Sequence, residues 1–319
     1  MCYSAMVKAD FKKYQQMFGA NMGIAEFHDM FFRRAEGAKL KVPKAVEAAF
    51  DLPQTEDERG IKELIDRHNA QQATSFEQEM FKQRKRLADA ERTLQTKATK
   101  KALDDQRIAT DKVRQLMGRL SDLKRTELLD RDSRMFPGYY VPVIVSEGGQ
   151  RVIKPMRYQC RLAGKPAFYD VKFPGTYNAR RDNLEGFWNG QFGHTHGLMI
   201  VSRFFENVNR HKAEGRELRP GEEPENMVLE FSPRPAHDML VACLWSKWTG
   251  PGEPDLLSFA AITDEPPAEV AAAGHDRCIV SIKPENIDAW LNPNPKDLTA
   301  LRAVLDDRDQ PYYEHRMAA

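Results

Sequence analysis

The sequence has few of the features that define several common protein classes. No stretch of about 18 consecutive apolar residues occurs in its 319 residues, and no apolar segment typical of a signal peptide follows Met1. We therefore expect neither membrane spanning nor secretion. The net charge is only +1, which excludes a uniformly basic protein but leaves room for local basic patches.

Cysteines are also scarce. The four of them, Cys2, Cys160, Cys243 and Cys278, lie far apart and form no CxxC pair, which argues against a zinc finger or a disulfide framework and fits a reducing cytoplasm. His194 and His196 form a His-x-His pair, but no third metal ligand has a suitable spacing. We predict a cytoplasmic protein without metal or cofactor, at the nucleoid in a bacterium or in the host cytoplasm for a virus.

Proline and glycine are nearly absent from one central segment. No proline lies between Pro53 and Pro137, and apolar residues such as Met80, Leu87 and Leu94 recur at helical intervals, which predicts one very long helix or a helical hairpin. Residues 82–125 hold fourteen Lys or Arg and six Asp or Glu, a local excess of +8. This basic run fits a solvated helix face, or contact with duplex DNA or a protein partner.

Short β-prone segments separated by proline and glycine turns follow residue 135, among them YYVPVIV, GLMIVSRFF, DMLVACLW and LLSFAAIT. They predict an α+β fold with a β-rich core of barrel-like antiparallel sheets and flanking helices. We expect a single domain in which residues 1–43 and 135–319 build this core. Residues 44–134 would then be a basic helical insertion.

The β-rich part contains several polar residues that could take part in chemistry. Asn178, Arg180 and Asp182 would share one face of an extended strand, because side chains alternate along a strand. Glu206 ends an apolar run, and His275 precedes a probable strand. Taken singly, each of these residues is more typical of a structural role, such as a turn asparagine or a surface acid.

The order of these motifs along the chain is more informative. MCYS at the start, NARRD at 178–182, RFFENV at 203–208 and HDRCIV at 275–280 resemble, in this order, the motifs of the SOS response-associated peptidase (SRAP) family of abasic-site processing proteins. The resemblance implies an SRAP-like fold and a DNA-damage function in which Cys2, after autocatalytic removal of Met1, crosslinks to abasic sites in single-stranded DNA. A lyase-like activity is implied as well.

The same resemblance implies the residues of the site. Cys2, Asn178, Glu206 and His275 match the catalytic positions of the family. The implied DNA-binding residues are Arg180, Arg277, Asp182 and Arg157. The chain departs from the family pattern at Tyr3-Ser4, where the family has Gly-Arg, at Asp182, where it has Glu, and at Val208, where it has Trp.

The chemistry itself explains why an N-terminal cysteine is needed. An abasic site equilibrates with an open-chain aldehyde, and the α-amine and thiol of one terminal cysteine can together close a five-membered thiazolidine on that carbon. An internal cysteine lacks the free amine. Glu206 would donate a proton to open the sugar ring, Asn178 would hold the α-amine, and His275 would move protons at the ribose hydroxyl.

Two other functions fit parts of the sequence. N-terminal nucleophile hydrolases, such as glutamine amidotransferases, also begin Met-Cys and use the thiol with its own α-amine as base. The substitutions at Tyr3, Asp182 and Val208 also fit a non-catalytic adaptor that binds nucleic acid or protein through its helical segment.

Overall fold

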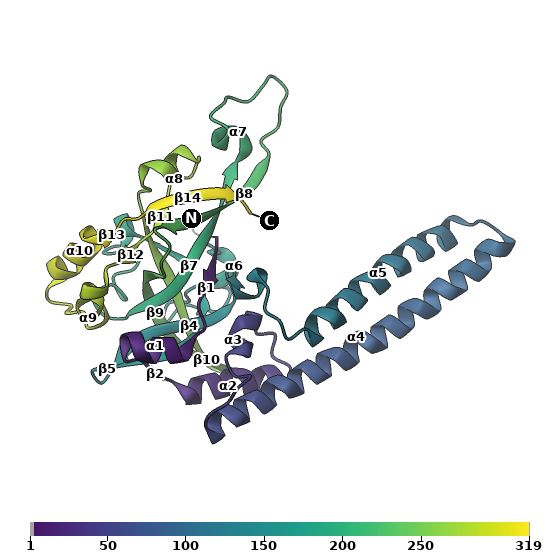
Figure 1. Cartoon of the computed structure of the whole chain (residues 1–319), viewed down its shortest axis with the longest axis horizontal. Helices are drawn as coiled ribbons and strands as arrows, with labels where there is room; N and C mark the ends of the chain where they lie inside the picture. Colours follow the sequence, from purple (N-terminus) through teal and green to yellow (C-terminus); the bar gives the residue numbers. More distant parts are fainter. Residues whose placement is uncertain (1–2, 319) are drawn as a thin grey trace. The chain divides into compact units, whose positions relative to one another are not determined.

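The computed structural model describes residues 3–318, which divide into two compact units. The strand-rich unit comprises residues 3–30, 39–52 and 129–318, and the helical unit comprises residues 31–38 and 53–128. Figure 1 shows the strands of the first unit and the two long helices of the second.

Five strands of the strand-rich unit close into a ring. They follow one another in the order β9, β10, β5, β4 and β7, and β7 pairs again with β9. All of these pairings are antiparallel except that of β5 with β10. The ring strands are β4 (Tyr140–Glu147), β5 (Gln150–Tyr158), β7 (His196–Asn209), β9 (Met239–Gly250) and β10 (Glu253–Asp264). The predicted α+β class with a barrel-like core is confirmed.

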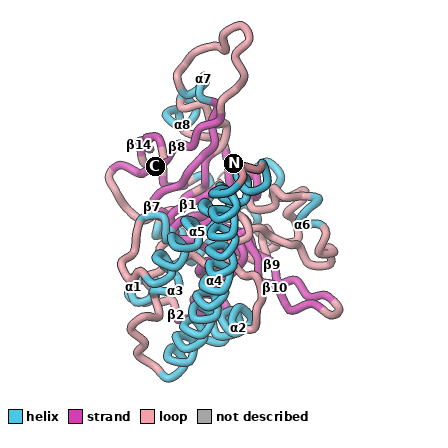
Figure 2. The backbone as a smooth tube through the Cα atoms, turned by 90° about the vertical axis from the view of Figure 1, so that its right-hand side faces the viewer, coloured by secondary structure: helices cyan, strands magenta, loops and turns pink. Residues whose placement is uncertain are grey.

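The remaining strands extend this ring at its edges. β1 lies between β7 and β3, β8 lies between β7 and β14, and both β6 and β11 pair with β10. They are β1 (Ser4–Val7), β2 (Asn21–Met22), β3 (Arg134–Met135), β6 (Asn178–Arg180), β8 (Asn226–Arg234), β11 (Cys278–Ile279), β12 (Ser281–Ile282), β13 (Arg308–Asp309) and β14 (Tyr312–Met317). Figure 2 shows the strands in magenta.

The core of this unit is apolar on both faces of its central strands. Continuous runs such as 140–145 in β4 and 198–201 in β7 are buried, as expected for strands that are covered on both sides. Phe11, Phe27 and Phe50 form an aromatic cluster with ring centroids 5.1 to 5.7 Å apart. This cluster joins helix α1 to helix α2 and to the residues after α3, so the N-terminal segment belongs to the same core.

Short helices complete the strand-rich unit, and α2 continues into the helical unit. Their bounds are α1 (Phe11–Phe18), α2 (Ile24–Ala35), α3 (Lys44–Ala48), α6 (Tyr169–Lys172), α7 (Arg210–Ala213), α8 (Ala268–Ala272), α9 (Ile287–Leu291) and α10 (Leu298–Asp306). Three 3₁₀ turns lie at η1 (Asp130–Ser133), η2 (Arg181–Asn183) and η3 (Pro284–Asn286). Among residues 3–318, no helix is both long and apolar enough to cross a bilayer.

The helical unit is a hairpin of two long helices, α4 (Glu56–Thr96) and α5 (Lys100–Lys124), which lie side by side in both views (Figure 1, Figure 2). The hydroxyls of Thr55 and Thr99 cap the two helices, each accepting a backbone N–H at 3.2 Å. Of the two alternatives predicted from the scarcity of proline and glycine, one very long helix or a helical hairpin, the structure has the hairpin.

Small side chains let α4 and α5 approach closely. On α5, Ala102, Ala109 and Leu116 recur at intervals of seven residues and are all buried. On α4, Ala90 is buried as well. This spacing places one narrow apolar stripe along the facing sides of the helices, and the other faces stay polar.

We expect the substitution Ala109→Leu to destabilise the hairpin by about 1–3 kcal/mol, because Ala109 is fully buried and has no room for a larger side chain. Ala88→Leu, at an exposed position of α4, is the matched control and should have little effect. Hydrogen exchange of the hairpin amides measures both. Equal protection in the two variants would contradict the tightly packed seam.

Candidate functional site

Strand β7 carries one acid into the apolar interior. Phe204, Glu206 and Val208 alternate along the strand and point to the same buried face, and the side chain of Glu206 is 0% exposed. The apolar run that precedes Glu206 in the sequence is therefore the strand that buries it. A carboxyl in this position requires polar neighbours.

His275 is the neighbour that the fold supplies. It lies just before β11, and its Nε2 is 3.3 Å from Oε2 of Glu206. The other ring nitrogen, Nδ1, lies 2.8 Å from the backbone carbonyl oxygen of Arg277, which fixes the orientation of the ring. Glu206 and His275, 69 residues apart in the sequence, are thus brought into direct contact.

Burial changes the acidity of both groups. It raises the pKa of Glu206 from 4.5 to about 8, and it lowers the pKa of His275 below its ordinary value. At neutral pH the carboxyl therefore keeps its proton, and the imidazole is neutral. A proton donor and a proton acceptor lie side by side, which is what general acid–base catalysis near pH 7 requires.

Tyr3 lies next to this pair. Strand β1 runs antiparallel to β7 with Ser4 opposite Phe205, so Tyr3 lies beside Glu206. A hydrogen bond from the backbone N–H of Tyr3 to the Glu206 carboxyl partly offsets the rise in its pKa. Arg134 supports this end of β1 by donating to the Ser4 hydroxyl at 3.1 Å and by covering the ring of Phe205. Cys2 itself lies outside the described residues.

Strand β10 positions Asn178 at the same end of the ring. β6 pairs with β10 through Asn178 opposite Ala261, and β11 pairs with the end of β10 through Ile279 opposite Thr263. β10 therefore gathers the segments that carry Asn178 and His275.

Two buried polar groups in this region have unfilled hydrogen-bonding capacity. Asn178 is only 6% exposed; its Oδ1 accepts from the hydroxyl of Tyr158 at 3.4 Å, and its Nδ2 has no partner among residues 3–318. The fully buried hydroxyl of Thr263 likewise has no partner within the described part of the chain. The sequence analysis did not single out Thr263, because a threonine that ends an apolar strand is common. Buried groups of this kind are available to a ligand.

The charged residues of the NARRD and HDR motifs form a small cluster. Asp182 accepts from the guanidinium of Arg180 at 2.7 Å and lies 3.5 Å from that of Arg277. The Arg180 side chain is half exposed, whereas that of Arg277 is 14% exposed, and its Nε has no partner among residues 3–318. The structure therefore brings three of the four predicted DNA-binding residues together.

Arg157, the fourth residue, lies in a different environment. Its guanidinium donates to Asp170 at 2.8 Å, and its side chain is only 15% exposed. Arg161 shares the same carboxylate, and both arginines hold the pKa of Asp170 below its ordinary value even though burial acts in the opposite direction. Arg157 is thus part of a partly buried ion-pair network.

A cavity of about 340 Å³ lies beside Asn178. Its lining includes Arg180, Lys172, and the aromatic rings of Phe173, Phe187 and Trp188. Phe173 and Phe187 are 38% and 37% exposed, so each offers part of a ring face to solvent. The sequence analysis missed these residues. The available signal was the number of aromatic residues in two loops on either side of the NARRD motif.

Other candidates from the sequence have structural roles. Nε2 of His196 accepts from the backbone N–H of Gly193 at 2.8 Å, and Nδ1 lies 3.0 Å from the carbonyl oxygen of Trp290, so neither ring nitrogen faces a metal. Burial lowers the pKa of His196 to about 3. Cys160, Cys243 and Cys278 are all buried, which raises the pKa of each thiol, for Cys160 to about 12.

Comparison with known families identifies the family of the chain. The β-rich α+β fold holds a buried acid–imidazole pair, which is the arrangement of an acid–base site. The profile of the SOS response associated peptidase (SRAP) family matches residues 92–318, so the chain belongs to this family. The matched region contains every candidate site residue except Cys2.

Solved structures with some similarity also exist. One is a protein from Bordetella bronchiseptica with 15% identity and a TM-score of 0.46, covering 59% of this chain and 87% of its own. A protein from Bacteroides thetaiotaomicron has 11% identity and a TM-score of 0.45, with 58% and 77% covered. A phage-related protein from Bordetella bronchiseptica has 15% identity and a TM-score of 0.44, with 61% and 85% covered. No curated protein sequence matches the chain.

The raised pKa of Glu206 predicts how stability depends on pH. The folded chain keeps this proton up to about pH 8, and the unfolded chain loses it near 4.5, so the stability of the wild type falls as the pH rises between these values. Glu206→Gln removes this dependence. The free energy of unfolding of the variant, relative to that of the wild type, should therefore rise by on the order of 3 kcal/mol between pH 4.5 and pH 7.

Thermal unfolding of both proteins at several pH values measures this difference. Glu230→Gln is the control, because Glu230 is buried but accepts from Arg203 and Arg316, so that its substitution should destabilise the protein. A constant difference between Glu206→Gln and the wild type across this pH range would show that Glu206 is ionised in the folded chain.

Proposed function

We propose that this protein forms a covalent thiazolidine adduct with abasic sites in single-stranded DNA through Cys2, once Met1 has been removed. The observation that supports this most is the buried Glu206–His275 pair at the end of β7 toward which the first strand of the chain leads. The protonated carboxyl and the neutral imidazole provide the proton transfers that the reaction needs. SRAP membership gives the reaction its setting in DNA metabolism.

The reaction balances as an aldehyde and a 1,2-aminothiol giving a thiazolidine and water. The α-amine of Cys2 attacks C1′ of the open-chain sugar, and the carbinolamine loses its hydroxyl as water with a proton from Glu206. The thiol then adds to the imine carbon, and its proton passes to the nitrogen. The remaining proton of the amine returns to Glu206, with His275 as the relay.

The other site residues hold the substrate. Asn178 supplies a buried amide beside the reacting region, with hydrogen-bonding capacity that a ligand can use. Arg180 and Arg277 would contact phosphates, because cations next to the lesion fix its register. In the cavity beside Asn178, the partly exposed rings of Phe173 and Phe187 offer faces for an unpaired base, as single-strand binding sites commonly do.

Removal of Met1 is the second reaction that we assign to this site. Hydrolysis of the Met1–Cys2 peptide bond adds water across the bond, places the new proton on the α-amine of Cys2 and leaves the carboxylate on methionine. The thiol of Cys2 as nucleophile and Glu206 as acid would suffice for this reaction. Mass spectrometry of freshly made wild type and Glu206→Gln would show whether Met1 is lost only when the acid is present.

The crosslink is tested with protein that begins at Cys2, as confirmed by mass, and a single-stranded oligonucleotide with one abasic site. We expect a shifted band on a denaturing gel that requires the abasic site and disappears in Cys2→Ala. Cys243→Ala, which removes a buried thiol, is the matched control and should still crosslink.

Other outcomes of this experiment would contradict the proposal. An adduct with the abasic strand that hydroxylamine cleaves would be an open imine, and would contradict closure of the thiazolidine ring by the thiol. The absence of any adduct from protein that begins at Cys2 would leave two functions, a non-catalytic adaptor and an N-terminal nucleophile hydrolase that forms a hydroxylamine-sensitive thioester with its own substrate.

The two environments of the arginines predict opposite effects. Arg180→Gln should weaken binding to abasic single-stranded DNA by several-fold without loss of stability, because its side chain is half exposed. Arg157→Gln should lower the melting temperature, because it leaves Asp170 with one partner fewer in a partly buried network. Fluorescence anisotropy and thermal unfolding of both variants measure this. The reverse pattern would place the DNA along Arg157.

A further inference from the structure

The helical hairpin carries cations that its own residues do not neutralise. We call residues 82–112, around the turn between α4 and α5, the hairpin tip. Eight of its Lys and Arg side chains are exposed and form no ion pair with any residue of the described chain. They are Lys82, Arg84, Lys85, Lys97, Lys100, Lys101, Arg107 and Lys112.

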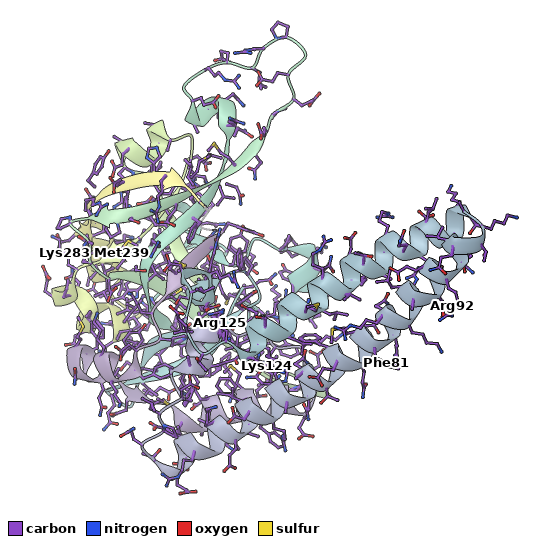
Figure 3. The ribbon with its side chains drawn as sticks, turned by 45° about the vertical axis from the view of Figure 1, so that its right-hand side comes forward. Phe81, Arg92, Lys124, Arg125, Met239 and Lys283 are labelled. Carbon is purple, nitrogen blue, oxygen red and sulfur yellow. The ribbon has the colours of Figure 1, made fainter. Side chains whose placement is uncertain are left out.

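Most cations elsewhere on the hairpin are paired, and the guanidinium of Arg119 lies over the ring of Phe76. Arg59 binds Glu56, Arg114 lies 3.4 Å from Asp111, and Lys124 lies 3.9 Å from Glu77. Figure 3 shows Arg92 close to the turn and Lys124 and Arg125 at the opposite end of α5. The local excess of positive charge noted in the sequence is therefore concentrated at the tip.

A groove of about 570 Å³ lies between α4 and α5, and some of these cations line it. Lys82, Lys85 and Lys101 line it, and Arg86 is held in place by Asp105 at 3.0 Å. The rest of the lining consists of small, hydroxyl-bearing or acidic side chains without any aromatic ring. The groove thus offers ammonium groups for phosphates and no ring for stacking on a base.

We infer that the hairpin tip binds the backbone phosphates of double-stranded nucleic acid. The tip holds ten Lys or Arg and five Asp or Glu, a net charge of +5. A polyanion that binds these cations releases its condensed counterions into solution and so gains free energy. On α4, Lys82 and Lys97 are 15 residues apart, or about 22 Å along a rigid helix, which suits the regular phosphate array of a duplex. This inference goes beyond the proposed function, because it involves neither Cys2 nor the strand-rich unit.

The test is binding of the full-length protein to a labelled 20-base-pair duplex without abasic sites, at several salt concentrations. Substituting Lys82, Lys85 and Lys101 by Gln should weaken binding about tenfold or more, and should reduce the slope of log K against log salt by about 2–3. The control variant replaces Arg59, Arg114 and Lys124 by Gln, with the same change in charge at paired positions, and should bind nearly as the wild type.

Further controls separate the effect of charge from loss of folding and from the proposed crosslinking. The variant with Arg at positions 82, 85 and 101 should retain binding, and circular dichroism should show an intact hairpin in every variant. Duplex DNA and duplex RNA of equal length identify the source of the phosphates, and binding to either supports the inference. Crosslinking to a short abasic single strand should be unchanged in all variants, so the two proposals fail separately.

Two results would overturn the inference. One is the absence of salt-dependent binding to either duplex, which would leave the tip to a partner of another class, such as an acidic protein. The other is an equal loss of binding in the tip variant and the control, which would show that net charge alone is responsible.

Discussion

A carboxylic acid buried on an otherwise apolar strand face is the constraint around which the strand-rich unit is arranged. Glu206 lies between the inward side chains of Phe204 and Val208, and an ionised carboxylate there would be costly. Burial raises the pKa of Glu206, so the carboxyl keeps its proton at neutral pH. Its polar neighbours are His275, with Nε2 at 3.3 Å, and the backbone N–H of Tyr3. An acid that is protonated at neutral pH is thereby placed beside a base and beside Tyr3.

Strand β10 pairs with the segments that carry the other site residues. It belongs to the closed ring, and it also accepts β6 and β11 at its C-terminal half, through Ala261 and Thr263 respectively. Asn178 and the HDR segment therefore reach the same end of the ring from distant parts of the chain. Because one strand aligns both segments, the spacing of their motifs in the sequence carries no information about their distance in space.

This explains what the sequence could and could not predict. The helical hairpin and the α+β class follow from local properties, namely the absence of proline and the short β-prone segments, and both are confirmed. Family resemblance alone placed Glu206 and His275 in one site, and their direct contact was not predicted, since no local rule joins them. The partner of Arg157 was missed because Asp170 lies in the short helix α6, and no local rule joins α6 to β5. The cavity beside Asn178 was missed because segments on both sides of the NARRD motif form it. Whether the candidate residues catalyse the proposed reaction stays a prediction, and Cys2 lies outside the described residues.

The proposed site lies in the strand-rich unit, whereas the exposed cations lie on the helical unit, so the two units are stabilised in different ways. Burial keeps Cys160, Cys243 and Cys278 in the thiol form, which is why the proposed reaction uses Cys2. The hairpin, by contrast, is held by a seam of small apolar residues such as Ala102 and Ala109, and its exposed lysines take no part in that seam. Their charge can therefore serve a ligand without a cost in packing. The inferred binding of duplex phosphates would thus use side chains that neither the seam nor an ion pair of the described residues employs.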